Sequence, residues 1–109
     1  MSKQKKVEYE VGSGNVFTDL GLEHAEELLT RAKLGHTVRM ILEKKKLKQK
    51  EIAALLETTQ AEVSKLMNGQ YHVFTEGRLF GFLNRLNKKV TVQITPRRLG
   101  ERPQEVVFV

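Results

Sequence analysis

The sequence predicts a mostly α-helical domain that contains a helix-turn-helix and one short β-strand near the C-terminus. Three observations support this fold class. Apolar residues recur at helical spacing between residues 23 and 86. Within residues 49–68, two short amphipathic segments are separated by about three residues, which is the spacing of a helix-turn-helix. Apolar and polar residues then alternate over residues 90–95, which is the pattern of a strand.

The chain of 109 residues divides into three predicted parts. Residues 1–22 are predicted to be a flexible N-terminal arm, because the run GSGN at residues 12–15 is typical of a turn or a joint. Residues 23–88 are predicted to form the helical domain. Residues 89–109 are predicted to form the C-terminal strand and a tail that ends in apolar residues.

The composition indicates a globular protein of the cell interior. Hydrophobic residues make up 39% and charged residues 29% of the chain, a balance that favours a folded domain over a disordered one. The absence of Cys excludes disulfides and thiolate metal sites and fits a reducing compartment. No apolar run approaches the roughly 18 residues of a membrane span. We therefore expect a cytoplasmic protein that makes no membrane contact.

The longest predicted helix covers roughly residues 23–45. Its apolar stripe has near-3.6 spacing and consists of Ala25, Leu28, Leu29, Ala32, Val38, Ile41 and Leu42. Gly35 lies in the middle of this pattern and costs about 1 kcal/mol relative to Ala in a helix. The pattern therefore predicts one long helix, and Gly35 is the place where it could be kinked or split.

Two shorter helices are predicted at residues 49–56 and 60–67. Their inward faces consist of Ile52, Ala53 and Leu56 on the first, and Val63, Leu66 and Met67 on the second. Gly69 is suited to end the second helix, and Thr75 is suited to N-cap a last helix that extends to about residue 86. The last helix would bury Leu79, Phe82, Leu83 and Leu86.

The net charge of +6 is concentrated directly upstream of the two short helices. Residues 31–50 hold eight Lys or Arg against one acid, whereas residues 51–70 hold one Lys against three acids. A basic cluster attracts phosphate with a strength that falls as the salt concentration rises. The candidate phosphate contacts are Lys44, Lys45, Lys46, Lys48 and Lys50. The alternative is a solvated, lysine-rich helix end without a binding role.

The second short helix has the polar outer face that DNA reading requires. In a helix-turn-helix, the first helix crosses the DNA backbone and the second lies in the major groove. There Gln can pair with adenine, Lys with guanine, and an Ala methyl can contact thymine. The outward residues are Gln60, Ala61, Glu62, Ser64, Lys65 and Asn68. Two short crossing helices can also be purely structural, so the shape alone leaves DNA binding open.

Residues 47–86 resemble the lambda-repressor-like, XRE/Cro-type DNA-binding domain of bacterial and phage regulators. The matching run is LKQKEIAALLETTQAEVSKLMNG, in which Gln49, Ala53, Val63 and Leu66 have the framework spacing of the family. From SGNVFTDLGL to VTVQI, the chain is also similar to HigA-type antitoxins. The resemblance implies a bundle of four to five helices that binds an operator as a homodimer.

The resemblance also implies roles for single residues. Gln49 would contact phosphate, and Thr59 and Asn68 would brace the DNA backbone at either end of the recognition helix. The residues that would face base edges are Gln60, Ala61, Glu62 and Lys65. The chain departs from the family where Glu57 replaces a usual Gly and where Thr58 replaces a usual apolar residue.

These departures have a predictable cost. A left-handed conformation at Glu57 would cost about 1 kcal/mol, and Thr58 would anchor the turn more weakly. Glu62 would repel phosphate unless it accepts a hydrogen bond from cytosine.

The C-terminal strand needs a partner, because a lone strand leaves its backbone groups unpaired. Its apolar face consists of Val90, Val92 and Ile94. The partner is either residues 7–11, residues 106–109, or the same strand of a second subunit, and the last choice is preferred as the dimer contact. A strand that binds a toxin is the sharper alternative.

Catalysis, metals and cofactors are not predicted. His24, His36 and His72 are scattered, and no spacing supports a catalytic triad. Tyr71 and Phe74 could stack on nucleic acid together with Arg78, or pack against the core. The sequence therefore predicts a non-enzymatic, sequence-specific regulator that binds double-stranded DNA and represses its own operon. The alternative is an antitoxin whose main role is to neutralise a protein toxin.

Overall fold

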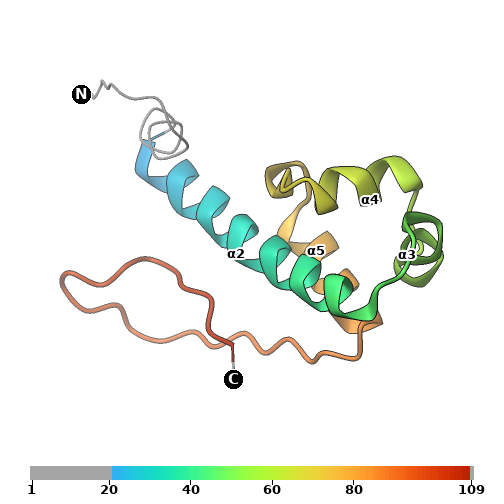
Figure 1. The fold of residues 1–109 in the computed structure, drawn as a ribbon. Helices are drawn as coiled ribbons and strands as arrows, with labels where there is room; N and C mark the ends of the chain where they lie inside the picture. The colour runs from blue at the N-terminus through green and yellow to red at the C-terminus, as the bar shows by residue number, and fades with distance from the viewer. Residues whose placement is uncertain (1–20, 109) are drawn as a thin grey trace.

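The structure is a computed structural model that describes residues 21–108. Within this range four α-helices follow one another, and a 3₁₀ turn lies between the last two (Figure 1). The elements are α2 (Gly21–Lys45), α3 (Gln49–Leu56), α4 (Gln60–Met67), η1 (Tyr71–Val73) and α5 (Glu76–Arg85). Most of the predicted arm, including the segment 7–11, lies outside the described residues.

Helix α2 is continuous through Gly35, so the predicted long helix is confirmed and is not split there. Gly35 is buried, and the ring of Tyr71 from η1 packs directly on it. A Cβ atom at Gly35 would lie 2.3 Å from Cδ1 of Tyr71. The glycine is therefore explained by the close approach of a neighbouring side chain and not by a break in the helix.

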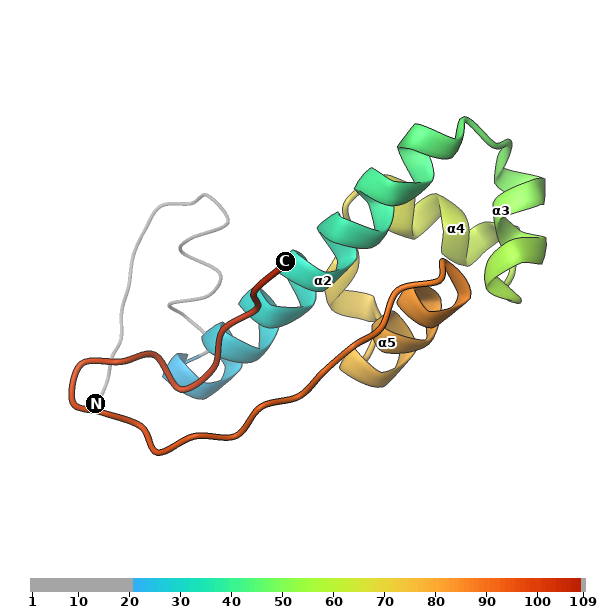
Figure 2. The same ribbon diagram turned by 90° about the horizontal axis from the view of Figure 1, so that it is seen from below.

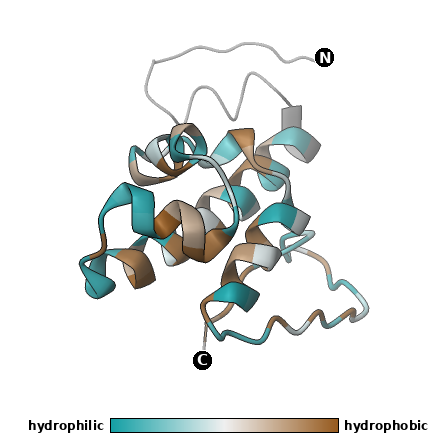
Figure 3. Cartoon of the chain, turned by 90° about the vertical axis from the view of Figure 1, so that its right-hand side faces the viewer, coloured by the Kyte–Doolittle hydropathy of each residue, from teal (hydrophilic) through white to brown (hydrophobic). Residues whose placement is uncertain are grey.

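One hydrophobic core joins the four helices. Its members are Leu34, Val38 and Leu42 of α2, Ile52, Ala53 and Leu56 of α3, Val63 and Leu66 of α4, and Phe74, Leu79, Phe82, Leu83 and Leu86 around α5. The predicted stripe of α2 omitted Leu34, whereas packing against the core was one of the two alternatives given for Phe74. Viewed from the α3–α4 end, the hydrophobic stretches of the helices turn toward one another and the hydrophilic ones face outward (Figure 3).

Helices α3 and α4 are joined by a three-residue turn whose geometry follows from its first residue. Glu57 is left-handed, with φ 56° and ψ 50°, so the cost of about 1 kcal/mol considered for this conformation applies. Its backbone conformation lets the N–H of Thr58 donate to the carbonyl of Ala53 at 2.9 Å, which closes the end of α3. Arg85 of α5 donates to the Glu57 carboxylate at 2.7 Å.

The residues after α5 run out from the helices and return along α2 (Figure 2). No strand is found in the part of the chain that the structure describes, so the predicted strand is not confirmed. Val92 and Ile94 are 69% and 91% exposed. A strand requires a neighbouring backbone to pair with, and within residues 21–108 none pairs with residues 90–95.

The returning segment is attached to α2 by an ion pair. Glu26 of α2 is buried, and its carboxylate accepts hydrogen bonds from Arg102 at 2.8 and 3.2 Å. Val106 is partly buried against the core, whereas Val107 and Phe108 remain exposed. The apolar C-terminal end therefore docks on the body through Val106 and leaves its next two side chains in solvent.

None of the helices in the described range has the length and hydrophobicity that crossing a membrane requires.

Candidate nucleic-acid interface

Helix α4 buries one side and leaves the other open. Val63 and Leu66 are 0% and 1% exposed. On the opposite side Gln60, Ala61 and Lys65 are exposed, and their side chains make no hydrogen bond or ion pair with another described residue. The helix therefore presents the polar side chains of Gln60 and Lys65 and the methyl group of Ala61 to solvent on this side.

Both ends of α4 are closed by local hydrogen bonds. The hydroxyl of Thr59 accepts the backbone N–H of Glu62 at 3.1 Å, which is an N-cap. At the other end Gly69 has φ 83°, and the N–H of Gln70 donates to the carbonyl of Lys65 at 2.9 Å. The predicted end of this helix at Asn68 and Gly69 is confirmed.

Asn68 and Ser64 form a pair on the outer side of α4. The amide of Asn68 donates to the hydroxyl of Ser64 at 3.3 Å. Asn68 is exposed and Ser64 is half-buried. Both side chains keep further hydrogen-bonding capacity, since an amide group has two donors and two acceptor lone pairs.

The start of α3 carries exposed polar side chains. The backbone N–H of Lys48 donates to Glu51 at 2.8 Å, which fixes the first turn of α3. Gln49, Lys48 and Lys50 are all exposed there. The three side chains predicted to contact phosphate at this helix start are therefore accessible.

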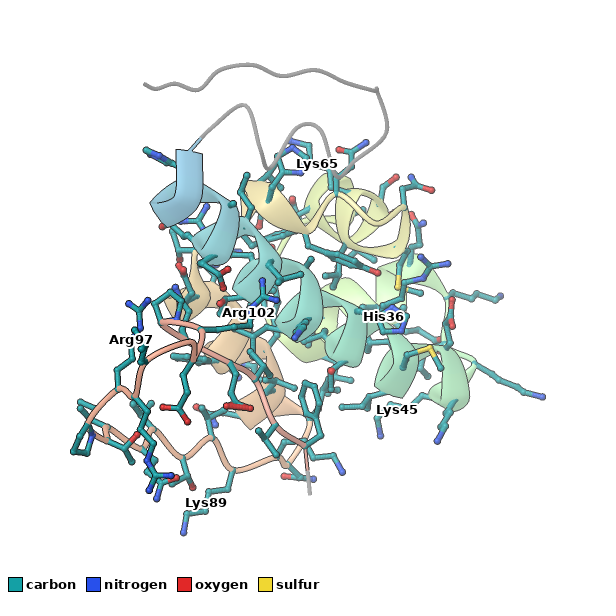
Figure 4. All side chains as sticks on the ribbon, turned by 90° about the vertical axis from the view of Figure 1, so that its left-hand side faces the viewer. His36, Lys45, Lys65, Lys89, Arg97 and Arg102 are labelled. Carbon is teal, nitrogen blue, oxygen red and sulfur yellow. The ribbon has the colours of Figure 1, made fainter. Side chains whose placement is uncertain are left out.

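The lysine run at the end of α2 lies elsewhere. Lys44, Lys45 and Lys46 are exposed, and Figure 4 shows Lys45 well below Lys65, toward the lower right of the view. Lys46 directly follows α2 and has φ 55°. Lys45 therefore does not adjoin Lys65 on the outer face of α4.

Glu62 has a partner that the sequence analysis did not foresee. Arg78 of α5 donates to its two carboxylate oxygens at 2.7 and 3.4 Å, and the hydroxyl of Thr58 also donates to it. The hydrogen bonds from Arg78 and then from Thr58 hold the pKa of Glu62 below its usual range. Glu62 is therefore a paired anion that ties α4 to α5, rather than a free carboxylate facing DNA.

With this geometry in place, the comparisons with known proteins decide the family. The model of a family described as a helix-turn-helix domain matches residues 16–95. The chain belongs to this helix-turn-helix domain family. A solved structure assigned to the XRE family of transcriptional regulators is similar to the chain with a TM-score of 0.68 and 28% sequence identity, over 78% of this chain and 96% of the other. A search of curated proteins found no match.

These comparisons confirm the predicted likeness to XRE-type regulators. The match to the helix-turn-helix domain family extends over all four described helices and over the segment that contains Val90, Val92 and Ile94. The similarity to HigA-type antitoxins stays a prediction.

The aromatic residues after α4 belong to the core of the helix-turn-helix domain. Phe74 is 2% exposed, and its ring meets that of Phe82 edge to face at 5.6 Å between centres. Tyr71 is packed on Gly35. Of the two alternatives for these rings, packing against the core is correct. Stacking on nucleic acid is not available to Phe74, because its faces are covered.

The paired state of Glu62 predicts a pH-dependent contribution to the stability of the helix-turn-helix domain. Because its pKa is lowered by folding, the pair stabilises the domain above the usual glutamate value of 4.5, and this contribution is lost as the pH falls through the lowered value. The pair is half exposed, so we expect a gain of at most about 1 kcal/mol. Glu62→Gln should therefore be less stable than wild type in urea unfolding at pH 7, and the difference should shrink at pH 3. An equal difference at both pH values would contradict this role.

Proposed function

We propose that this helix-turn-helix domain protein is a sequence-specific regulator of transcription that binds double-stranded DNA and represses its own operon in the cytoplasm. The observation that carries the proposal is the outer face of α4. Gln60, Ala61 and Lys65 are exposed and unengaged there, on a helix capped at both ends. A capped helix with free polar side chains is suited to enter the major groove. The proposed activity needs neither a cofactor nor a metal.

The residues divide into base-reading and backbone-contacting groups. Gln60 and Lys65 can pair with adenine and guanine, and Ala61 can contact a thymine methyl. Ser64 and Asn68 contribute further hydrogen bonds from the same side. Phosphates are contacted from the start of α3, by Gln49, Lys48 and Lys50, and from the α4 N-cap by Thr59. Glu62 takes no part in base reading in this proposal, because its carboxylate is already paired.

The test is binding to the DNA upstream of the gene, measured by fluorescence anisotropy at two salt concentrations. Saturable binding that unrelated duplex does not displace is expected. Lys65→Ala should weaken binding to the cognate site by about 1–3 kcal/mol, roughly 5- to 160-fold, and should relax specificity at one base pair.

Lys45→Ala is the matched control. It removes the same charge on a different side of the molecule, so we expect its effect to be smaller and equal for all sequences. Equal affinity of the wild type for every duplex would contradict sequence-specific binding. A uniform loss for Lys65→Ala would make Lys65 a phosphate contact.

We further propose that the protein is a homodimer that pairs residues 90–94 of two subunits. Val90 is partly buried against its own core, whereas Val92 and Ile94 on the same side of the alternating pattern are exposed. An antiparallel pair centred on Val92 would place Val90 opposite Ile94 of the second copy. Each exposed isoleucine would then be covered by the body of the other subunit, and two α4 helices could meet successive major grooves.

A second candidate is an antitoxin that neutralises a protein toxin. The exposure of several apolar side chains after α5 favours a protein partner at that end of the molecule; these are Val92, Ile94, Leu99, Val107 and Phe108. Co-expression with the product of a neighbouring small gene, followed by co-purification, tests this candidate. DNA binding and toxin binding are compatible, because they use different parts of the chain.

A further inference from the structure

Arg78 connects three parts of the domain. Its guanidinium lies 5.3 Å from the centre of the Phe82 ring and 5.8 Å from that of Phe74, so two core aromatic rings hold it in place. From this position it donates to the hydroxyl of Thr58 in the turn at 3.3 Å and to Glu62 at 2.7 Å. One cation thus bridges the core, the turn and the first turn of α4.

The position of Glu62 makes this contact important for a DNA-binding helix. The first turn of a recognition helix is the part that lies closest to base edges. A carboxylate without a partner at that place would repel the phosphates of both strands, since DNA is densely charged. Arg78 supplies a compensating charge, and as a residue of α5 it approaches Glu62 from the side of the core.

We propose that Arg78 is a positioning residue for DNA binding, which neutralises Glu62 and holds its carboxylate toward α5. Helix α4 then presents Gln60, Ala61 and Lys65 without a free negative charge among them. This inference rests on the proposed function. It also accounts for an acidic residue within an otherwise neutral and basic reading helix.

The experiment compares four proteins on the upstream DNA that the wild type binds: wild type, Glu62→Gln, Arg78→Met and the double variant. Methionine keeps an unbranched apolar side chain over Phe74 and Phe82 but removes the charge. Arg78→Met should bind about tenfold more weakly, because Glu62 becomes an unpaired anion next to phosphate. Glu62→Gln should bind at least as tightly as wild type. The double variant should return to within about threefold of wild type, because it has lost both charges.

Restoration in the double variant is the decisive readout. If Arg78 itself contacted DNA, or only supported the fold, the double variant would bind as weakly as Arg78→Met, and the inference would be overturned. Unchanged binding by Arg78→Met would overturn it as well. Thermal unfolding of each variant checks that the domain is folded at the assay temperature.

Arg78→Lys provides a second test, which does not depend on the folding of Arg78→Met. It keeps a positive charge beside Glu62 but loses the paired N–H donors of the guanidinium and its stacking on the two rings, so it should bind more weakly than wild type by less than about fivefold. A loss of tenfold or more for Arg78→Lys would contradict neutralisation as the role of Arg78. Failure of the wild type to bind any duplex would instead contradict the proposed function, so the two failures are distinguishable.

Discussion

Replacing Gly35 by Ala is expected to destabilise the domain, although Ala is the better helix former. The new Cβ would lie 2.3, 2.5 and 2.7 Å from Cδ1, Cγ and Cβ of Tyr71. These atoms are the base of the ring and its attachment, so no flexible end can move aside. Overpacking of this kind costs about 1–3 kcal/mol, which exceeds the gain of about 1 kcal/mol in helix propensity. Urea unfolding measures the net change.

Gly81→Ala is the matched control for this prediction. Gly81 also lies inside a helix, α5, but a Cβ there would meet nothing within 4 Å. The same substitution should therefore stabilise the domain by about 0.5–1 kcal/mol. If both substitutions changed the free energy of unfolding in the same direction, the contact between residue 35 and Tyr71 would not determine the effect at Gly35.

The second large effect is expected from Ile94→Glu, which should convert the proposed dimer to a monomer. Ile94 is 91% exposed in the single chain, so the change should leave the fold of each subunit intact. In the dimer the new carboxylate would be buried twice, once from each subunit. We expect the dimer dissociation constant to rise by about 100-fold or more, as measured by sedimentation equilibrium. Affinity for the operator should fall in parallel.

Gln93→Glu controls for the added charge. Gln93 lies on the opposite side of the alternating segment and is exposed, so the variant should remain dimeric. A dimer that survives Ile94→Glu would place the subunit interface elsewhere on the molecule.

The parts of the fold that were predictable depend on neighbours in sequence. Helices α3 and α4 were predicted with the bounds that the structure has, because apolar spacing and the caps at Thr59 and Gly69 are local signals. The sequence identified Glu57 as the position where this turn could be left-handed, and the structure shows that conformation there. In each case the residues that determine the conformation lie within one or two helical turns of one another.

The features that sequence reasoning missed depend on contacts between distant residues. Gly35 suggested a weak point in α2, since nothing local reveals that Tyr71 packs on it. Glu62 was assigned to base reading because the helical pattern places it near the outer face, and its partner Arg78 lies on another helix. One local signal was available, since Thr58 and Glu62 have the spacing of neighbours on a helix surface. It could have suggested a hydrogen bond, but not the arginine.

The ion pair between Glu26 and Arg102 affects how residues 87–101, which include the exposed Val92 and Ile94, could bind a partner. Because residues 86 and 102 are both fixed to the body, the intervening residues form a closed loop rather than a free tail. A tethered loop has already lost much of the conformational freedom that a free peptide loses on binding. A partner that adds a strand along Val92 and Ile94 would therefore bind a segment that is already partly ordered. Breaking the ion pair of Arg102 would lower the affinity for that partner, although no contact between the partner and residues 92–94 would change.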